Sequence, residues 1–138
     1  MAKPMSAKAA AARAEGFRSQ FEHAFAEDLA SRGVSWLYEK VVLTWLPPHK
    51  PRRYTPDFSI TTQSGKVLDI ETKGLMDAAD RLKLKCVVAQ HPLLDLRLVF
   101  QNPNLKITKR SKTTYGMWAT QAGIKWAAKR LPGAWLDE

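Results

Sequence analysis

The feature that most constrains the fold is a pair of β-rich segments separated by only three turn residues. DFSITT begins at Asp57 and KVLDIET ends at Thr72, with Gln63, Ser64 and Gly65 between them. Segments of this length joined by a short turn are typical of neighbouring antiparallel strands. We therefore predict that the two segments pair at the centre of a sheet.

Helical patterns flank these predicted strands. Phe21, Phe25 and Leu29 recur at a spacing of four after Ser19, and Gly33 follows as a stop signal. Further along, we predict a helix over 77–90 with Leu82, Cys86, Val87 and Ala89 available for burial, a strand over 94–100, a basic loop over 102–114 and a helix over 115–122. Residues 34–39 and 41–45 read as a strand or a hairpin, and 124–136 is ambiguous. Mixed strands with flanking helices predict an α/β or α+β fold.

Length and composition indicate one globular domain. The chain has 138 residues, of which 45% are hydrophobic, enough for one core and too few for two ordinary domains. Residues 1–16 are Ala-rich and basic, which predicts a flexible N-terminal arm before a single domain over 17–138. No apolar run is long enough to span a bilayer, so we expect a cytoplasmic protein with no membrane partner. The sole cysteine, Cys86, excludes an internal disulfide and is expected in the core.

The positive charges concentrate in two acid-free stretches, which predicts a polyanionic partner. The formal net charge is +9, and no acidic residue occurs in 96–136 or in 40–56. Nucleic acid fits this pattern best. Arg97 is one of the basic residues of the first stretch. The alternative is a basic protein whose lysines are simply solvated. The five tryptophans could stack on bases, but their spacing favours the core, and the dispersed histidines His23, His49 and His91 lack the spacing of metal ligands.

The residues that carry chemistry lie at one end of the predicted strand pair. Pro56 and Asp57 begin the first strand, and Glu71, Thr72 and Lys73 end the second. In an antiparallel pair these positions are neighbours, and Lys73 points the same way as Glu71 because strand side chains alternate. Two carboxylates, with the backbone carbonyl of Thr72, form an oxygen ligand set suited to Mg²⁺. The alternative is two surface carboxylates and a solvated lysine.

Glu22 has two possible roles. It follows Ser19 by three residues, which is the spacing of a helix capping box. Its carboxylate could instead join Asp57 and Glu71 and help hold a second metal ion. The sequence leaves both roles open.

Several motifs together resemble one family. FRSQFE, YTPDF, DIETKGL, TTYG and GIKWAAKRLP occur in the order found in the bacteriophage endonuclease I family of Holliday junction resolvases. The resemblance implies the PD-(D/E)xK nuclease fold, in a domain-swapped homodimer with the proline-rich segment 45–51 as the bridge between the swapped parts. It places Glu22 from one subunit beside Asp57, Glu71 and Lys73 of the other.

The same resemblance implies the reaction and the cofactor. The expected enzyme is a deoxyribonuclease that nicks two strands across a four-way junction, leaving 5′-phosphate and 3′-hydroxyl ends. It would use two Mg²⁺ ions per active site, replaceable by Mn²⁺, with no small-molecule cofactor, in the cytoplasm of an infected bacterial host. The candidate DNA contacts are Arg18, Lys109, Arg110, Lys112, Tyr115 and Lys125.

Two other functions fit the same residues. One is a basic DNA-binding protein without catalysis, which has no use for acidic groups beside a phosphate. The other is a PD-(D/E)xK nuclease that cuts linear or mismatched duplex, which only substrate geometry separates from a junction enzyme.

Overall fold

A mixed sheet forms the centre of the molecule in the computed structural model, which describes residues 16–47 and 50–138. The predicted arm over 1–16 and His49 therefore lie outside the described residues, apart from Gly16. Within the described residues the main sheet has the strand order β1 (Trp36–Tyr38), β4 (Phe58–Thr61), β5 (Val67–Lys73), β6 (Leu96–Phe100) and β7 (Trp126–Ala128). The pairs β1·β4 and β4·β5 are antiparallel, whereas β5·β6 and β6·β7 are parallel.

The predicted strand pair over 57–72 is confirmed. Phe58 lies opposite Ile70 and Thr61 opposite Val67, and Gly65 in the turn has a φ of 86°, which glycine adopts without strain. Extension of this register by one position brings Asp57 next to Glu71. β5 is the middle strand of the sheet, as the sequence predicts.

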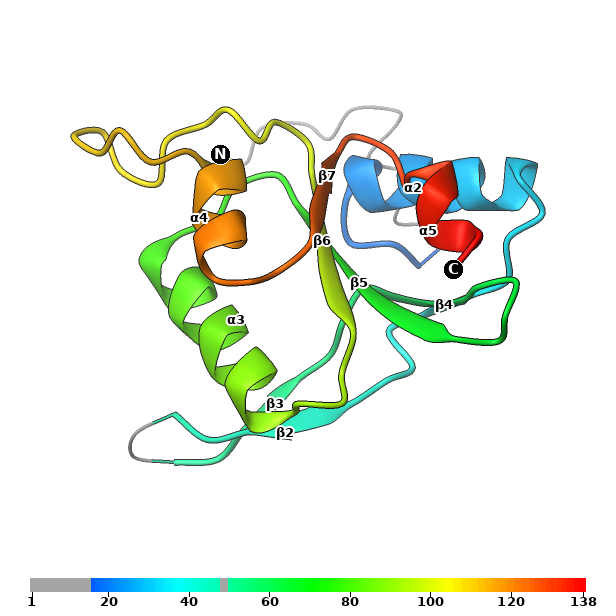
Figure 1. Ribbon diagram of the computed structural model, residues 1–138, viewed down its shortest axis with the longest axis horizontal. Helices are drawn as coiled ribbons and strands as arrows, with labels where there is room; N and C mark the ends of the chain where they lie inside the picture. The colour runs from blue at the N-terminus through cyan, green and yellow to red at the C-terminus, as the bar shows by residue number, and fades with distance from the viewer. Residues whose placement is uncertain (1–15, 48–49) are drawn as a thin grey trace, which may run out of the picture.

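Helices cover both faces of the sheet (Figure 1). α2 (Gln20–Ser31) and the short α5 (Gly133–Leu136) lie on one face, and α3 (Ala78–Gln90) and α4 (Tyr115–Gln121) lie on the other. Each face has its own hydrophobic cluster, one containing Phe25 and Leu29 of α2 and the other containing Leu84 and Trp118. The predicted mixed sheet flanked by helices is therefore confirmed. No helix among the described residues is long and apolar enough to cross a membrane.

The segment before Asp57 contains the predicted strands but not a hairpin between them. The stretches over 34–39 and 41–45 do not pair with each other, because β1 joins the main sheet while β2 (Leu43–Trp45) pairs with β3 (Arg52–Tyr54). The chain therefore reverses between Trp45 and Arg52, whereas its prolines favour an extended connector. Burial of Trp45 and Tyr54 against α3 outweighs that local preference.

Two other predictions are wrong in detail. α3 buries Leu84 and Val87, while Leu82 and Ala89 are exposed and Cys86 is half-buried against the core. Spacing alone cannot decide between adjacent helix faces, because packing against β2 and the sheet chooses the face. Arg97 is fully buried, where it pairs with Asp95 and Glu138, so this member of the acid-free stretch is not available to a polyanion. The tryptophans do pack on the two clusters, as predicted.

Candidate active site

Asp57 occupies a buried position at the end of the sheet where β5 finishes. The residue is 4% exposed, and its Oδ2 accepts two hydrogen bonds from Thr72, at 2.9 Å from the backbone N–H and 2.8 Å from the hydroxyl. Thr72 therefore fixes the orientation of the Asp57 carboxylate, a role that the sequence did not predict. The Thr72 backbone carbonyl, predicted as a metal ligand, belongs to the same strand end.

Glu71 and Lys73 point to the same side of β5, as strand alternation predicts. Glu71 is 6% exposed, and the ammonium Nζ of Lys73 lies 3.5 Å from its Oε1. The hydroxyl of Tyr54 donates to the other oxygen, Oε2, at 2.7 Å. Asp80, in the first turn of α3, lies 3.4 Å from the same ammonium, so Lys73 is held between two carboxylates.

Glu22 also reaches this end of the sheet. Ser19 caps α2 by accepting from the backbone N–H of Glu22, but the Glu22 carboxylate accepts from the hydroxyl of Tyr38 at 2.7 Å. The carboxylate is buried and faces the sheet. The predicted cap is confirmed at the backbone N–H of Glu22, whereas its carboxylate bonds to Tyr38 and lies near Asp57. Its role in holding a second metal ion stays a prediction.

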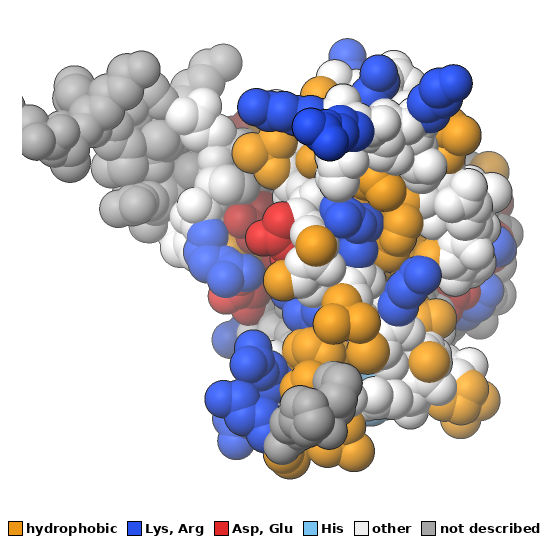
Figure 2. All heavy atoms as spheres, turned by 90° about the vertical axis from the view of Figure 1, so that its left-hand side faces the viewer, with side chains coloured by type: hydrophobic (Ala, Val, Ile, Leu, Met, Phe, Trp, Pro, Cys, Tyr) orange, Lys and Arg blue, Asp and Glu red, His pale blue; other side chains and the backbone are white. Residues whose placement is uncertain are grey.

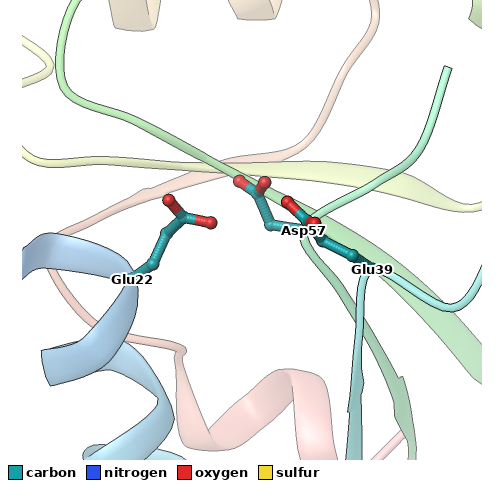
Figure 3. A group of neighbouring side chains, drawn as sticks. All are labelled: Glu22, Glu39 and Asp57. Atoms are coloured by element: carbon teal, nitrogen blue, oxygen red, sulfur yellow. The ribbon is translucent and has the colours of Figure 1, made fainter. Parts of the chain in front are cut away.

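Glu39 is the member of the site that sequence reasoning missed. Oxygens of Glu22, Glu39 and Asp57 lie within 4.8 Å of one another, and Figure 3 shows the three carboxylates converging from α2, from the residue after β1 and from the residue before β4. Glu39 has a φ of 49°, and its N–H donates to the carbonyl of Asp57. No motif singled it out, since it follows a short strand in an ordinary polar context.

Arg18 provides a positive charge beside this acidic group. Its guanidinium Nε lies 2.6 Å from Glu39, and another nitrogen lies 3.6 Å from Asp57. The side chain is 68% exposed, so it remains accessible while making both contacts. In this structure Arg18, a predicted DNA contact, neutralises part of the carboxylate charge.

The buried carboxyl groups of Asp57 and Glu71 have raised pKa values. Burial, together with the charge of Glu71, raises the pKa of Asp57 to about 7, although Thr72 opposes the change. Burial likewise raises the pKa of Glu71. Burial alone would lower the pKa of Lys73, but Glu71 and Asp80 outweigh it and the pKa is raised, so Lys73 is cationic. Two buried acids with displaced pKa values beside one ammonium are typical of a functional site.

The donor chemistry at this edge fits a hard divalent cation. Carboxylate and carbonyl oxygens are the ligands that Mg²⁺ prefers, and the described residues here offer no soft sulfur ligand. A divalent cation would offset the burial and the repulsion by Glu71 that together raise the pKa of Asp57. The residues present therefore fit the metal that the motif predicts.

Comparison with known proteins decides the family. The protein-family model described as Phage endonuclease I matches residues 1–138 of this chain. The chain belongs to this family. It is 37% identical over 122 residues to Endonuclease I of Escherichia phage T7, an alignment that covers 88% of this chain and 79% of that protein. It is also 39% identical over 122 residues to Endodeoxyribonuclease 1 of Enterobacteria phage T3, covering 88% of this chain and 78% of that protein.

The basic loop of this phage endonuclease I family member lies at the same end of the sheet as the acidic residues. The loop leaves the end of β6, where the N–H of Gln101 donates to the carbonyl of Lys73. Its exposed basic loop triad consists of Lys109, Arg110 and Lys112. Figure 2 shows Lys and Arg side chains gathered along the upper rim, where this loop lies, and again at the lower left, with acidic side chains between the two groups.

Two other predicted DNA contacts lie elsewhere. Tyr115 is buried, and its hydroxyl accepts from the backbone N–H of Met76, so it belongs to the core instead of the surface that a DNA contact requires. Lys125 precedes β7 and lies near Glu138, at the end of the parallel strands opposite to Lys73. The N-cap position of Thr114 and the packing of α4 turn Tyr115 inward, which its place beside a basic loop could not reveal.

Proposed function

We propose that this chain is a Mg²⁺-dependent endonuclease that resolves four-way junctions and other branched DNA as a homodimer. The observation that carries the proposal is the buried pair of Asp57 and Glu71 beside the ammonium of Lys73, in a chain of the phage endonuclease I family. Relatives named as an endonuclease and an endodeoxyribonuclease support the reaction class.

The metal ions would be held by the acidic residues at the end of β5. Asp57, Glu71 and the backbone carbonyl of Thr72 would hold one Mg²⁺, and Glu22 together with Asp57 would hold a second, with Mn²⁺ able to replace either. Bound there, the metal would make water nucleophilic near neutral pH and neutralise charge on the phosphate.

Lys73 and Thr72 have the other roles in the proposed reaction. Lys73 is held cationic by Glu71 and Asp80, at contacts of 3.5 and 3.4 Å, and so offers a positioned charge to the developing negative charge on the scissile phosphate. Thr72 holds the Asp57 carboxylate in one orientation through two hydrogen bonds, which reduces the reorganisation that metal binding requires. Cleavage would leave a 5′-phosphate and a 3′-hydroxyl.

A dimer with two such sites suits a substrate with two equivalent strands, because paired nicking requires two active sites related by symmetry. In the proposed swapped arrangement the segment 45–51 crosses between subunits, and Glu22 of one chain joins Asp57, Glu71 and Lys73 of the other. In the single chain Glu22 already lies beside Asp57, and β2 pairs with β3. The swap would open this hairpin and replace the contact within one chain by the equivalent contact between two chains. The hairpin connection lies between Glu22 and the other three residues in sequence, as such an exchange requires. Exchange of identical elements through such a connection is a common route to dimers.

Substrate selection would rest on the shape of the DNA backbone. Lysine and arginine contact phosphates, which carry no base identity. The loop that carries the basic loop triad leaves β6 at the same end of the sheet as the acidic site. We propose that this triad and Arg18 contact the arms of a junction.

A non-catalytic DNA-binding role is the competing proposal, but the acidic group opposes it. Burial of Asp57 and Glu71 costs the protein folding free energy. Their negative charges also repel a phosphate unless a cation lies between them. An enzyme needs these carboxylates to hold its metal, whereas a protein that only binds DNA gains nothing from them.

The proposal is tested by cleavage of a labelled four-way junction beside a linear duplex with the same arms, with Mg²⁺ or with EDTA. The variants are Asp57→Asn and, as a matched control, Asp69→Asn, since Asp69 is another buried acid of the same sheet and its bond from Ser59 leaves it outside the predicted ligand set. We expect metal-dependent cutting of the junction by the wild type and Asp69→Asn, with loss in Asp57→Asn. Binding without cutting would leave the non-catalytic role, and equal cutting of the linear duplex would exclude junction selectivity.

The swapped dimer has a separate test by subunit mixing. Glu22→Ala and Lys73→Ala dimers are each expected to be inactive, but mixing them with subunit exchange should restore one intact site per mixed dimer. Mixed dimers that remain inactive after exchange is verified would contradict the shared site.

A further inference from the structure

A tyrosine outside the predicted ligand set contacts the centre of the site. Tyr54 is 3% exposed, and its hydroxyl donates to Oε2 of Glu71 at 2.7 Å. The two residues come from different sheets, because Tyr54 ends β3 of the two-stranded sheet and Glu71 lies on β5 of the main sheet. This hydrogen bond is therefore a tertiary contact between the hairpin and the active-site strand.

The two oxygens of the Glu71 carboxylate have different partners. Oε2 receives the hydroxyl of Tyr54, while Oε1 lies 3.5 Å from the ammonium of Lys73. A carboxylate is acceptor-only, so Tyr54 must be the donor, and the torsion of the carboxylate is set from one side by a rigid, buried ring. Each oxygen keeps a lone pair for a further ligand.

The ordinary explanation for a buried tyrosine is that its hydroxyl needs any polar partner. Tyr115 fits that explanation, because its hydroxyl accepts the backbone N–H of Met76 and is not hydrogen-bonded to a carboxylate among the described residues. Tyr54 differs, because its partner is an acidic group for which the proposed function gives a direct role. Residues that hydrogen-bond to metal ligands fix ligand orientation, and their loss weakens metal affinity by roughly 10- to 100-fold.

Resting on the proposed function, we propose that Tyr54 is a positioning residue for metal binding, which holds Glu71 in the orientation in which its carboxylate accepts the cation. Because Tyr54 belongs to β3, it also links the order of the metal site to the β2–β3 hairpin. Metal affinity thereby depends on a residue of the strand that directly follows the segment 45–51 proposed to cross between subunits.

The test is a Mn²⁺ titration of the full chain without DNA, followed by calorimetry, for the wild type, Tyr54→Phe, Tyr115→Phe and Glu71→Gln. Tyr54→Phe keeps the buried ring and removes only the hydroxyl. We expect Mn²⁺ affinity to fall roughly 10- to 100-fold in Tyr54→Phe and to stay within about two-fold in Tyr115→Phe, which loses a buried hydrogen bond of similar burial. Circular dichroism confirms that both variants are folded.

A kinetic readout separates positioning from general weakening of the fold. The Mn²⁺ concentration that gives half-maximal junction cleavage should rise in Tyr54→Phe by the same factor as the dissociation constant, while the rate at saturating Mn²⁺ stays within a few-fold of the wild type. Unchanged Mn²⁺ affinity in Tyr54→Phe, with loss in Glu71→Gln, would overturn this inference alone. Absence of Mn²⁺ binding by the wild type would overturn the proposed metal dependence as well.

Discussion

Removal of one negative charge at the active site should stabilise the metal-free protein at high pH. Asp57→Asn removes the charge of the carboxyl whose pKa is about 7 in the folded protein, against an ordinary value of 3.8. The asparagine Oδ1 can still accept the backbone N–H of Thr72, so the main packing and one of the two hydrogen bonds persist. The variant resembles the protonated acid at every pH.

The magnitude follows from the two pKa values. Between them the folded protein holds a proton that the unfolded chain has lost, so the free energy of unfolding falls as the pH rises from about 4 to about 7. A difference of about 3 in pKa corresponds to about 4 kcal/mol, the largest effect that the charge alone can produce. Asp57→Asn should therefore match the wild type near pH 4 and exceed its stability by up to about 4 kcal/mol at pH 8.

Urea denaturation in EDTA at a series of pH values between 4 and 8.5 measures this difference. Addition of Mg²⁺ at pH 8 should stabilise the wild type and have little effect on Asp57→Asn, because the variant lacks a ligand. A stability difference between the two proteins that is independent of pH would refute the inference that Asp57 is a buried carboxyl group with a raised pKa.

Three further outcomes are expected. Gly116→Ala should lower the free energy of unfolding by about 1–3 kcal/mol in urea denaturation, because its Cβ would lie 2.6 Å from Cζ2 of Trp126, whereas Gly133→Ala, with open space around it, should cost little. Lys73→Ala should keep its affinity for a junction in a gel-shift assay and lose cleavage by roughly 100- to 1,000-fold. Replacement of the basic loop triad by alanine should weaken junction binding in fluorescence anisotropy and reduce the slope of log affinity against log salt by about 3; an unchanged slope would exclude these residues from phosphate contact.

The centre of the site was predictable because it depends on local patterns. Alternating apolar residues and a three-residue turn determine that β4 and β5 pair, and the register then brings Asp57 beside Glu71. Strand alternation further places Lys73 on the same side as Glu71. These contacts follow from spacing within about twenty residues, and the family motifs extend along the chain in the same order.

The partners of these residues were decided only by the tertiary structure. Glu39, Tyr54 and Asp80 reach the site through pairings of β1 with β4, of β2 with β3, and through the start of α3. Neither pairing follows from the local pattern, since the segments 34–39 and 41–45 could equally have formed a hairpin together.

The same distinction between local sequence and tertiary structure explains which basic residues are exposed. The sequence determined that the chain is basic and where its acid-free stretches lie, but Arg97 is buried in ion pairs while the basic loop triad is exposed. Propensity and alternation act between neighbours in the chain, so the sequence alone determines them. Burial depends on which distant segments cover a side chain, and that is fixed only when the two faces of the sheet are packed against their helices.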